Sequence, residues 1–380
     1  MGGLIMEMDM GVPRKDKWME LARQSVVHLQ PFPGDLPDLP VDRIRERLGI
    51  DRVTKLSFNE NPYGPSPRAI EAMQSQLASL HLYQDATGEA LRHAIATDLD
   101  VSPEQIILTN GADELILLLA LAFLDHDDEV IIPSPTFGQY WASSIAMGAR
   151  PVLVSLTDLH IDVEAILGAV TPRTKMVFLC NPNNPTGTIV DGQELEHLIE
   201  KLPESILLVT DEAYVDYVTD PSFASGLRYL SHRANLIVMR TFSKIHALAA
   251  ARVGFGISHA PLIDILHRVR PPFNVSAIGQ AGALASWQDT DYQRKMLELN
   301  TANREYLYKL LTATRFSYVP SQANFVLVDT KQEAVVVYKR LEAKGIIVRN
   351  GAGFGLPRHL RITIGRKEDM SRLGQVLRYC

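Results

Sequence analysis

Short apolar runs of strand length recur between residues 105 and 257, and stretches of helical character separate most of them. The expected strands are residues 105–109, 129–132, 151–155, 175–179, 206–210, 236–239 and 253–257. The expected helices between them include residues 114–123, 137–147 and 194–201. Because strands that are joined by helices run in the same direction, this alternation predicts an α/β fold. Its large sheet should be mostly parallel and wrapped by helices on both faces.

The sequence changes character after about residue 275. A smaller α+β domain is expected there, with elements at residues 293–313, 324–328, 334–344, 346–349 and 360–364. The first 50 residues are rich in proline and irregular apart from a helical piece at residues 41–48, which predicts an arm. We therefore expect a large domain over residues 55–275. The N-terminal arm and the small domain should comprise residues 1–54 and 276–380.

Composition excludes several classes of protein. The net charge is -6 without a long run of either sign, which argues against a nucleic-acid or membrane-surface partner. No apolar run is long enough to span a membrane, and residues 1–10 lack the pattern of a signal peptide. The two cysteines, Cys180 and Cys380, fit a reducing compartment and predict a cytoplasmic location. The eleven histidines have no ligand spacing, so no metal site is expected.

Lys244 follows the strand at residues 236–239 and two hydroxyl residues, Thr241 and Ser243, and Arg252 comes eight residues later. A lysine at a strand end, among hydroxyls and near a second cation, has the setting of a Schiff-base lysine. Desolvation and a nearby positive charge lower the pKa of an amine and make it nucleophilic. Taken alone, the stretch fits a solvated loop lysine and a surface arginine better.

Other polar groups also follow predicted strands. The backbone of residues 111–113 lies between a strand and a helix, where N–H groups and the helix dipole suit a phosphate. Asn184 and Asp211 follow the next two strong strands along the chain. Each could be a cap or a turn on its own. Because ligands of parallel sheets bind at the carboxyl ends of the strands, these groups together with Lys244 indicate one site.

A series of motifs extends over nearly the whole chain. They occupy residues 59–67, 83–92, 111–114, 135–138, 181–187, 210–214, 240–244, 252–255, 272–276 and 360–365. In type and order they resemble the motifs of fold-type I pyridoxal-phosphate (PLP) enzymes of the class I and II aminotransferases. The resemblance is greatest to the histidinol-phosphate aminotransferase branch. It implies the PLP-transferase fold and pyridoxal 5'-phosphate as the cofactor.

The resemblance also implies roles at the cofactor. Lys244 would form the Schiff base and move a proton to and from the substrate. Asp211 would pair with the protonated pyridine nitrogen. Asn184 and Tyr214 would hydrogen-bond the phenolic oxygen of the ring. Phe137 would stack on the ring, or equally well pack in the core. The phosphate would be held by Gly111, Ala112, Asp113, Thr241, Ser243 and Arg252.

For the substrate, the resemblance implies that Arg361 binds the α-carboxylate and that Arg349 faces the distal group. Asn61 and Asn184 would also contact the substrate. Tyr83 resembles the tyrosine that reaches the phosphate of the neighbouring subunit, which implies a homodimer with active sites at the interface.

The implied activity is transamination between an L-amino donor, histidinol phosphate or glutamate, and a 2-oxo acid or imidazole-acetol phosphate. An aromatic amino acid aminotransferase of the phenylpyruvate type is an alternative, because the residues around Arg349 do not fix the distal group. A PLP-dependent decarboxylase of the O-phosphothreonine type is a third reading. A binding protein that keeps the fold without the chemistry is a fourth. The glycine-rich residues 350–355 are expected to form a flexible loop over the site.

Overall fold

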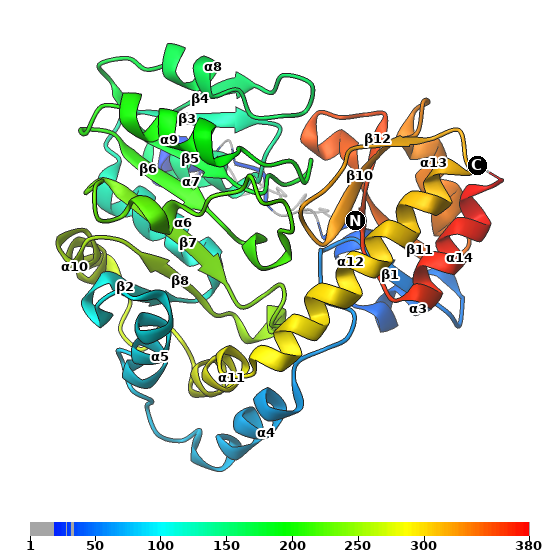
Figure 1. Cartoon of the computed structure of the whole chain (residues 1–380), viewed down its shortest axis with the longest axis horizontal. Coiled ribbons are helices and arrows are strands. Elements are labelled where there is room, and N and C mark those ends of the chain that lie inside the picture. The colour runs from blue at the N-terminus through cyan, green and yellow to red at the C-terminus, as the bar shows by residue number, and fades with distance from the viewer. Residues whose placement is uncertain (1–18, 28, 32–33, 380) are drawn as a thin grey trace, which may run out of the picture.

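The computed structural model describes residues 19–27, 29–31 and 34–379, and the expectations on residues 1–18 and on Cys380 lie outside these ranges. Two sheets form two separate lobes (Figure 1). The larger has seven strands in the order β2-β8-β7-β6-β5-β3-β4, and the smaller has five in the order β1-β11-β12-β10-β9. The long helix α12 (Thr290–Thr312) runs from one lobe to the other.

The large sheet confirms the predicted fold class. Its strands are β2 (Ile106–Thr109), β3 (Glu129–Ser134), β4 (Arg150–Ser155), β5 (Thr174–Cys180), β6 (Leu207–Asp211), β7 (Leu236–Thr241) and β8 (Gly254–Ile257). The five strands from β3 to β7 pair in parallel. Strand β8 runs antiparallel to both of its neighbours, β7 and β2. Central strands such as β6 are buried at every position, which is why they appear as continuous apolar runs.

Helices cover both faces of this sheet. The first face packs on α5 (Glu89–Leu99), α8 (Val163–Gly168), α9 (Gly192–Lys201) and α11 (Ala277–Trp287). The second face packs on α6 (Gly111–Phe123), α7 (Gln139–Met147) and α10 (Ala260–Val269). The short α4 (Pro67–Ser75) lies against α11 at the lower end of the molecule (Figure 1). Helices α5, α8, α10 and α11 were not predicted from the sequence.

The smaller sheet has its own core. Its strands are β1 (Thr54–Leu56), β9 (Ser317–Tyr318), β10 (Phe325–Asp329), β11 (Ile346–Asn350) and β12 (His359–Thr363). Residues of α12, α13 (Ala334–Glu342) and α14 (Lys367–Leu377) pack with these strands in one apolar cluster. Helix α14 was not predicted. The remaining described α-helices are α2 (Gln24–Val27) and α3 (Val41–Leu48).

The domain division needs two adjustments. The predicted boundary between residues 54 and 55 falls inside β1, which pairs in parallel with β11 of the smaller sheet. Helix α11 was assigned to the second unit but packs against α4 and α5 beside the large sheet. We therefore propose that the large domain begins after β1 and includes α11.

Short 3-10 helices connect these elements. Those near the site are η1 (Leu36–Asp38), η4 (Val215–Tyr217), η6 (Ala249–Ala251) and η7 (Gly351–Phe354). The last of these corresponds to the glycine-rich segment that was expected to be a flexible loop. Within the described ranges, no helix combines the length and apolar character needed to cross a membrane. No group of three or more His, Cys, Asp or Glu side chains among these residues could hold a metal ion.

Candidate active site

The carboxyl ends of β5, β6 and β7 bring the predicted catalytic residues together. Cys180, the last residue of β5, pairs with Asp211, the last residue of β6, and Asp211 pairs with Met239 of β7. Lys244 follows β7 by three positions. The parallel register therefore places the carboxylate and the amine at the same edge of the sheet, as the strand-end pattern predicted.

Asp211 is a buried carboxylate with neutral partners. Its Oδ1 accepts a hydrogen bond from the Ala213 N–H at 2.9 Å, and its Oδ2 accepts one from the Tyr140 hydroxyl at 2.5 Å. No cationic side chain of the described residues forms a salt bridge with it. Burial raises the pKa of Asp211 to about 6. A buried carboxylate in this state is stabilised by a cation that binds beside it.

Tyr140 is a site residue that the sequence reasoning missed. It lies on α7, it is completely buried, and its ring stacks on Phe178 at a centroid distance of 4.5 Å. Phe137 lies three residues earlier, before α7 begins, and meets the Tyr140 ring edge-on at 5.6 Å. The half-buried Phe137 also packs against the large core, and its stacking on the cofactor ring stays a prediction. Its spacing of three residues from Phe137 was the available signal for Tyr140.

Lys244 is half-buried rather than a solvated loop residue. Its Nζ lies 3.5 Å from the carbonyl oxygen of Phe58 and 5.5 Å from the centroid of the Tyr214 ring. Burial, and secondly the positive charge of Arg361, lower the pKa of Lys244 to about 8. At pH 7 about a tenth of this amine is therefore neutral and nucleophilic, far more than for an ordinary lysine.

Residues 57–59, directly after β1, connect the predicted site residues to one another. The Ser57 carbonyl accepts a hydrogen bond from Arg361 at 2.6 Å, and the next carbonyl, that of Phe58, faces Lys244. The Asn59 side chain donates to the Tyr214 hydroxyl at 3.0 Å. The sequence predicted no individual role for Ser57 and Phe58, because they act through backbone carbonyls, which any residue has.

Arg361 is buried without an acidic partner among the described residues. Its side chain donates to the Asn184 Oδ1 at 2.6 Å and lies over the rings of Phe325 and Phe354. Its Nε is buried and has no hydrogen-bond partner. Burial lowers the pKa of Arg361 to about 10. The orphaned Nε–H of Arg361 therefore suits an anion.

The hydroxyls and the arginine that were predicted to hold a phosphate lie together. Thr241 Oγ1 donates to Ser243 Oγ at 3.0 Å, and Arg252 NH1 lies 3.5 Å from the same Ser243 oxygen. The Arg252 guanidinium also pairs with Asp113 at 3.2 Å. Helix α6 begins beside them at Gly111, where Ala112 and Asp113 occupy the first turn. The first N–H groups of a helix have no partner within it, so this end can bind an anion.

Two glycines allow the groups of this predicted phosphate site to lie close together. Gly111 has a φ of +73°, and a Cβ at this position would collide with the Arg252 guanidinium. A Cβ at Gly254 would lie 2.7 Å from the Gly111 carbonyl carbon. The start of α6 can approach β8 and Arg252 because neither residue has a side chain.

A buried ion pair between Glu212 and Arg240 connects the ends of β6 and β7. Glu212 accepts two hydrogen bonds from Arg240, at 3.1 and 2.8 Å, and one from the Gly226 N–H at 2.7 Å. The Glu212 side chain is 1% exposed. Because Glu212 follows Asp211 and Arg240 lies four residues before Lys244, the pair connects the ends of β6 and β7.

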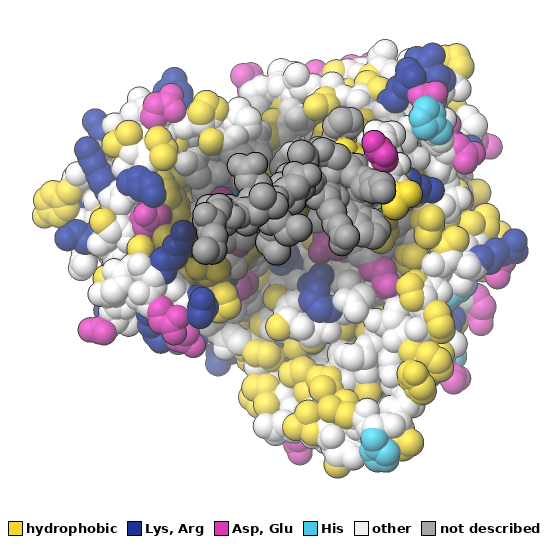
Figure 2. Space-filling model, turned by 180° about the vertical axis from the view of Figure 1, so that it is seen from behind, with side chains coloured by type: hydrophobic (Ala, Val, Ile, Leu, Met, Phe, Trp, Pro, Cys, Tyr) yellow, Lys and Arg dark blue, Asp and Glu magenta, His cyan; other side chains and the backbone are white. Residues whose placement is uncertain are grey.

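Tyr83 lies on the surface of the single chain. Its side chain is 84% exposed, and its ring stacks on Phe273 at 4.6 Å. Exposed leucines precede it in the chain, at positions 77, 80 and 82. Figure 2 shows hydrophobic side chains gathered at the lower end of the molecule, where Figure 1 places α4.

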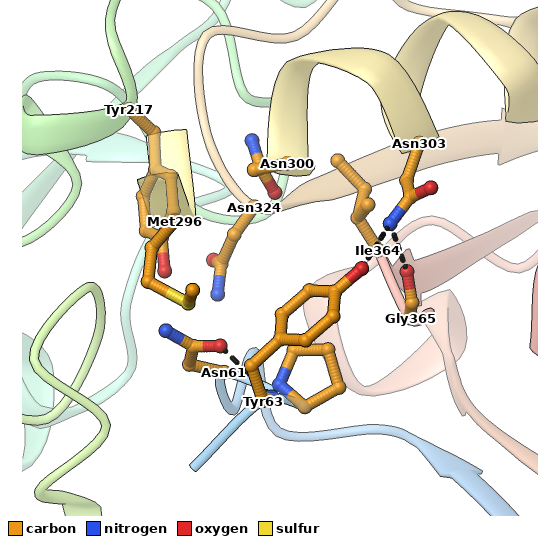
Figure 3. Close-up of a pocket in the computed structure, with 10 residues that line it drawn as sticks. Asn61, Tyr63, Tyr217, Met296, Asn300, Asn303, Asn324, Ile364 and Gly365 are labelled. Carbon is orange, nitrogen blue, oxygen red and sulfur yellow. Dashed lines mark hydrogen bonds between the residues drawn. The ribbon is translucent and has the colours of Figure 1, made fainter. Parts of the chain in front are cut away.

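Asn61 supports the lysine loop. Its Nδ2 donates to the Ile245 carbonyl at 2.9 Å, directly after Lys244, and its Oδ1 accepts from the Tyr63 N–H. Figure 3 shows Asn61 at one side of a small cavity of about 10 Å³. Asn303 on the other side donates to the Tyr63 hydroxyl and the Gly365 carbonyl.

Arg349 is held by an acidic residue of the N-terminal segment. Its NH1 donates to Asp38 Oδ1 at 2.6 Å, and its guanidinium lies over the Phe58 ring at 5.7 Å. It is the cross-strand neighbour of Arg361. Sequence reasoning placed Arg349 toward the substrate and did not identify Asp38.

The residues present fit pyridoxal phosphate. The buried Asp211 can balance a protonated ring nitrogen, and Lys244 supplies an amine of lowered pKa for the aldehyde. Two hydroxyls, a guanidinium and a helix N-terminus are grouped for the phosphate. This donor set matches the three reactive parts of the cofactor.

Comparison with known proteins gives a consistent result. Residues 51–377 match the family "Aminotransferase class I and II". The chain is 40% identical over 357 residues to a histidinol-phosphate aminotransferase of Moorella thermoacetica. This alignment covers 94% of this chain and 92% of that protein. It is 41% identical over 342 residues to the enzyme of that name from Brevibacillus brevis, with 90% and 94% covered.

Solved structures agree with this result. The crystal structure of histidinol-phosphate aminotransferase from Sinorhizobium meliloti in complex with pyridoxal-5'-phosphate superposes with a TM-score of 0.86 at 26% identity, covering 93% of this chain and 96% of that one. Aspartate aminotransferase from Thermus thermophilus with maleate gives a TM-score of 0.82 at 25% identity, with 94% and 99% covered. The chain thus belongs to the class I and II aminotransferases, and it is an enzyme that transfers amino groups with pyridoxal phosphate as its cofactor.

Proposed function

We propose that this enzyme transfers the amino group of glutamate to imidazole-acetol phosphate, forming histidinol phosphate, and that it also catalyses the reverse reaction. The relatives that are 40% and 41% identical carry the name of this activity. The observation that carries the proposal is Arg361, whose buried Nε–H lacks a partner next to Asn184. Glutamate offers a carboxylate to this group. Histidinol phosphate offers a phosphate ester in the position where an amino acid has its carboxylate.

We propose roles for the residues at the centre. The cofactor supplies an electron sink for the carbon that loses its proton. Lys244 Nζ takes this proton from the substrate carbon and returns it. Asp211 keeps a positive charge on the ring nitrogen, and Tyr140 orients the Asp211 carboxylate. Tyr214 and Asn184 hydrogen-bond the phenolic oxygen.

The phosphate group is proposed to bind at the start of α6. Arg252 would rotate from its surface pair with Asp113, because exposed pairs of this kind contribute only about 0–1 kcal/mol. The hydroxyls of Thr241 and Ser243 and the first N–H groups of the helix would complete the site, with residues 111–113 as the helix start.

We propose further that the enzyme is a homodimer with active sites at the interface. The support is the exposed apolar surface formed by Leu77, Leu80, Leu82, Tyr83 and Phe273. A second copy would bury this surface, and Tyr83 would reach the phosphate of the neighbouring subunit. The low cysteine content supports the proposed cytoplasmic location.

The activity can be tested with purified enzyme and the cofactor. Histidinol phosphate and 2-oxoglutarate should give glutamate, and Lys244→Ala should abolish this turnover while the protein stays folded. Turnover of histidinol phosphate no faster than that of unrelated amines would reject the proposed substrate.

An aromatic amino acid is a second candidate donor. The observation that favours it is the Arg349–Asp38 pair over the Phe58 ring, because an arginine already matched by a carboxylate suits an uncharged aromatic group. Competition between histidinol phosphate and phenylalanine as donors decides between the two. We expect histidinol phosphate to have the larger kcat/KM.

A further inference from the structure

Asp38 is a buried carboxylate on the N-terminal segment. Its side chain is 3% exposed, although it belongs to the three-residue helix η1 at the edge of the small domain. Oδ1 accepts the hydrogen bond from Arg349, and Oδ2 accepts one from the Asp35 N–H at 3.0 Å. Both carboxylate oxygens are therefore held, and the orientation of Asp38 toward Arg349 is defined.

Arg349 and Arg361 are directly opposite each other on the antiparallel strands β11 and β12. Side chains in such positions lie on the same face of the sheet and close together. Arg361 is the guanidinium beside Asn184 and the lysine loop. Arg349 thus lies one strand away from the reacting centre, and Asp38 balances the second of two neighbouring positive charges.

The η1 helix is also linked to Arg361 through Ser57. Ser57 Oγ donates to the Pro37 carbonyl at 3.0 Å, and the Ser57 carbonyl accepts from Arg361 at 2.6 Å. The next residue, Phe58, has its ring under the Arg349 guanidinium. Residues 37 and 38 therefore contact Ser57 and Arg349, which connects Asp38 to both of the arginines that are proposed to face the substrate.

A transaminase binds two different substrates in turn at one site. In the proposed reaction, one distal group is the second carboxylate of glutamate and the other is an imidazole ring. A guanidinium suits the carboxylate, but a ring without negative charge cannot balance the charge of the half-buried Arg349. Asp38 offers Arg349 a carboxylate from the chain itself for this half of the reaction.

We infer that Asp38 is a specificity-determining residue, which pairs with Arg349 when the distal group of the substrate carries no negative charge and releases Arg349 when that group is a carboxylate. This inference rests on the proposed function. A distal carboxylate must displace Asp38 from Arg349, so Asp38 lowers the affinity for such substrates. An uncharged ring stacks beside Phe58 without breaking the pair.

The test is the equilibrium binding of two unreactive acids to the cofactor-loaded enzyme, measured by titration calorimetry. Glutarate carries a second carboxylate, whereas 3-phenylpropionate carries an uncharged ring. Asp38→Asn keeps the shape and removes the charge. It should tighten glutarate binding by about threefold to tenfold and leave 3-phenylpropionate unchanged. The matched control is Asp42→Asn, since Asp42 is 84% exposed and pairs only with Arg45 among the described residues.

Two outcomes would overturn the inference. If glutarate binds more weakly to Asp38→Asn, Asp38 only positions Arg349. If both acids change by the same factor, or neither changes, Asp38 does not discriminate between them. A second comparison guards against a folding defect, because Asp38→Asn should have no effect on the glutarate affinity in an Arg349→Gln background.

The same experiment separates this inference from the proposed function. If the unmodified enzyme fails to convert histidinol phosphate, the proposed substrate is wrong. The ratio of the two affinities still tests Asp38 in that case, because neither acid takes part in the reaction.

Discussion

Lys244 acts through a lowered pKa, and the cause is its burial beside Arg361. Only the neutral amine attacks the cofactor aldehyde, so the rate of covalent capture by the cofactor-free enzyme should rise about tenfold per pH unit below pH 8 and level off above it. Stopped-flow absorbance measures this rate. Arg361→Gln removes a neighbouring positive charge and should move the midpoint to higher pH. A midpoint near that of an ordinary lysine, about 10.4, would contradict the assignment.

The buried carboxylate of Asp211 should lower the stability of the cofactor-free protein near neutral pH. Its raised pKa means that the folded cofactor-free protein holds a proton that the unfolded chain releases between about pH 4 and 6. Stability from this group therefore falls as the pH rises through that window. Asp211→Asn should stabilise the cofactor-free protein at pH 7 by about 1–3 kcal/mol, and by little at pH 4. Urea unfolding at the two pH values measures this, and a destabilisation at pH 7 would refute it.

We expect Tyr140 to affect cofactor binding through its hydrogen bond to Asp211. Tyr140→Phe keeps the buried ring and removes the hydrogen bond to the carboxylate. Cofactor affinity should fall by about 1.5–3 kcal/mol, the usual value for a hydrogen bond to a charged group. Fluorescence titration with the cofactor measures this loss. The control is Tyr229→Phe, which removes a hydroxyl that donates to Gly192. Equal effects of the two substitutions would rule out a specific role for Tyr140.

Residue identities were predictable where a side chain follows a strand. Lys244 and Asp211 could be found in this way, whereas Arg361 lies inside β12 and was identified only through the resemblance of residues 360–365. Ser57 and Phe58 act through backbone carbonyls, which have no sequence signal. Asp38 meets Arg349 across 311 positions of the chain, and no local pattern encodes such a contact.

At the scale of elements, the Glu212–Arg240 pair holds the ends of β6 and β7 in register. Arg240→Met would leave Glu212 buried without a cation and should cost about 3–5 kcal/mol of unfolding free energy. Denaturant unfolding measures the loss. Arg268→Met removes an exposed pair with Asp264 on α10 and should cost less than about 1 kcal/mol. Similar losses for both variants would show that the buried pair has no special part in the register.

The elements themselves were predictable to different degrees. The buried strands of the large sheet could be located because they are continuous apolar runs between turn residues. The antiparallel direction of β8 could not be predicted, since a short strand carries no mark of its partners. Helix α11 was missed because small residues such as Gly279 and Gly282 fill its buried face, where Met73 of α4 packs closely.

At the scale of the whole molecule, the account requires a second copy of the chain. Leu80→Glu places a charge in the exposed apolar surface around Tyr83, where the leucine is 53% exposed. The variant should be monomeric at micromolar concentration in sedimentation experiments and should bind the cofactor more weakly. The control is Leu153→Glu on the edge strand β4, where the leucine is 56% exposed. An Leu80→Glu enzyme that keeps its mass and its cofactor affinity would exclude this surface as the interface.

The central claim is that the amine of residue 244 holds the cofactor at the sheet edge that also carries Asp211. The direct measurement is borohydride reduction of the loaded enzyme, followed by proteolysis and mass spectrometry. The account predicts one pyridoxyl phosphate adduct per chain, on Lys244. An adduct on another lysine, or none, would contradict it.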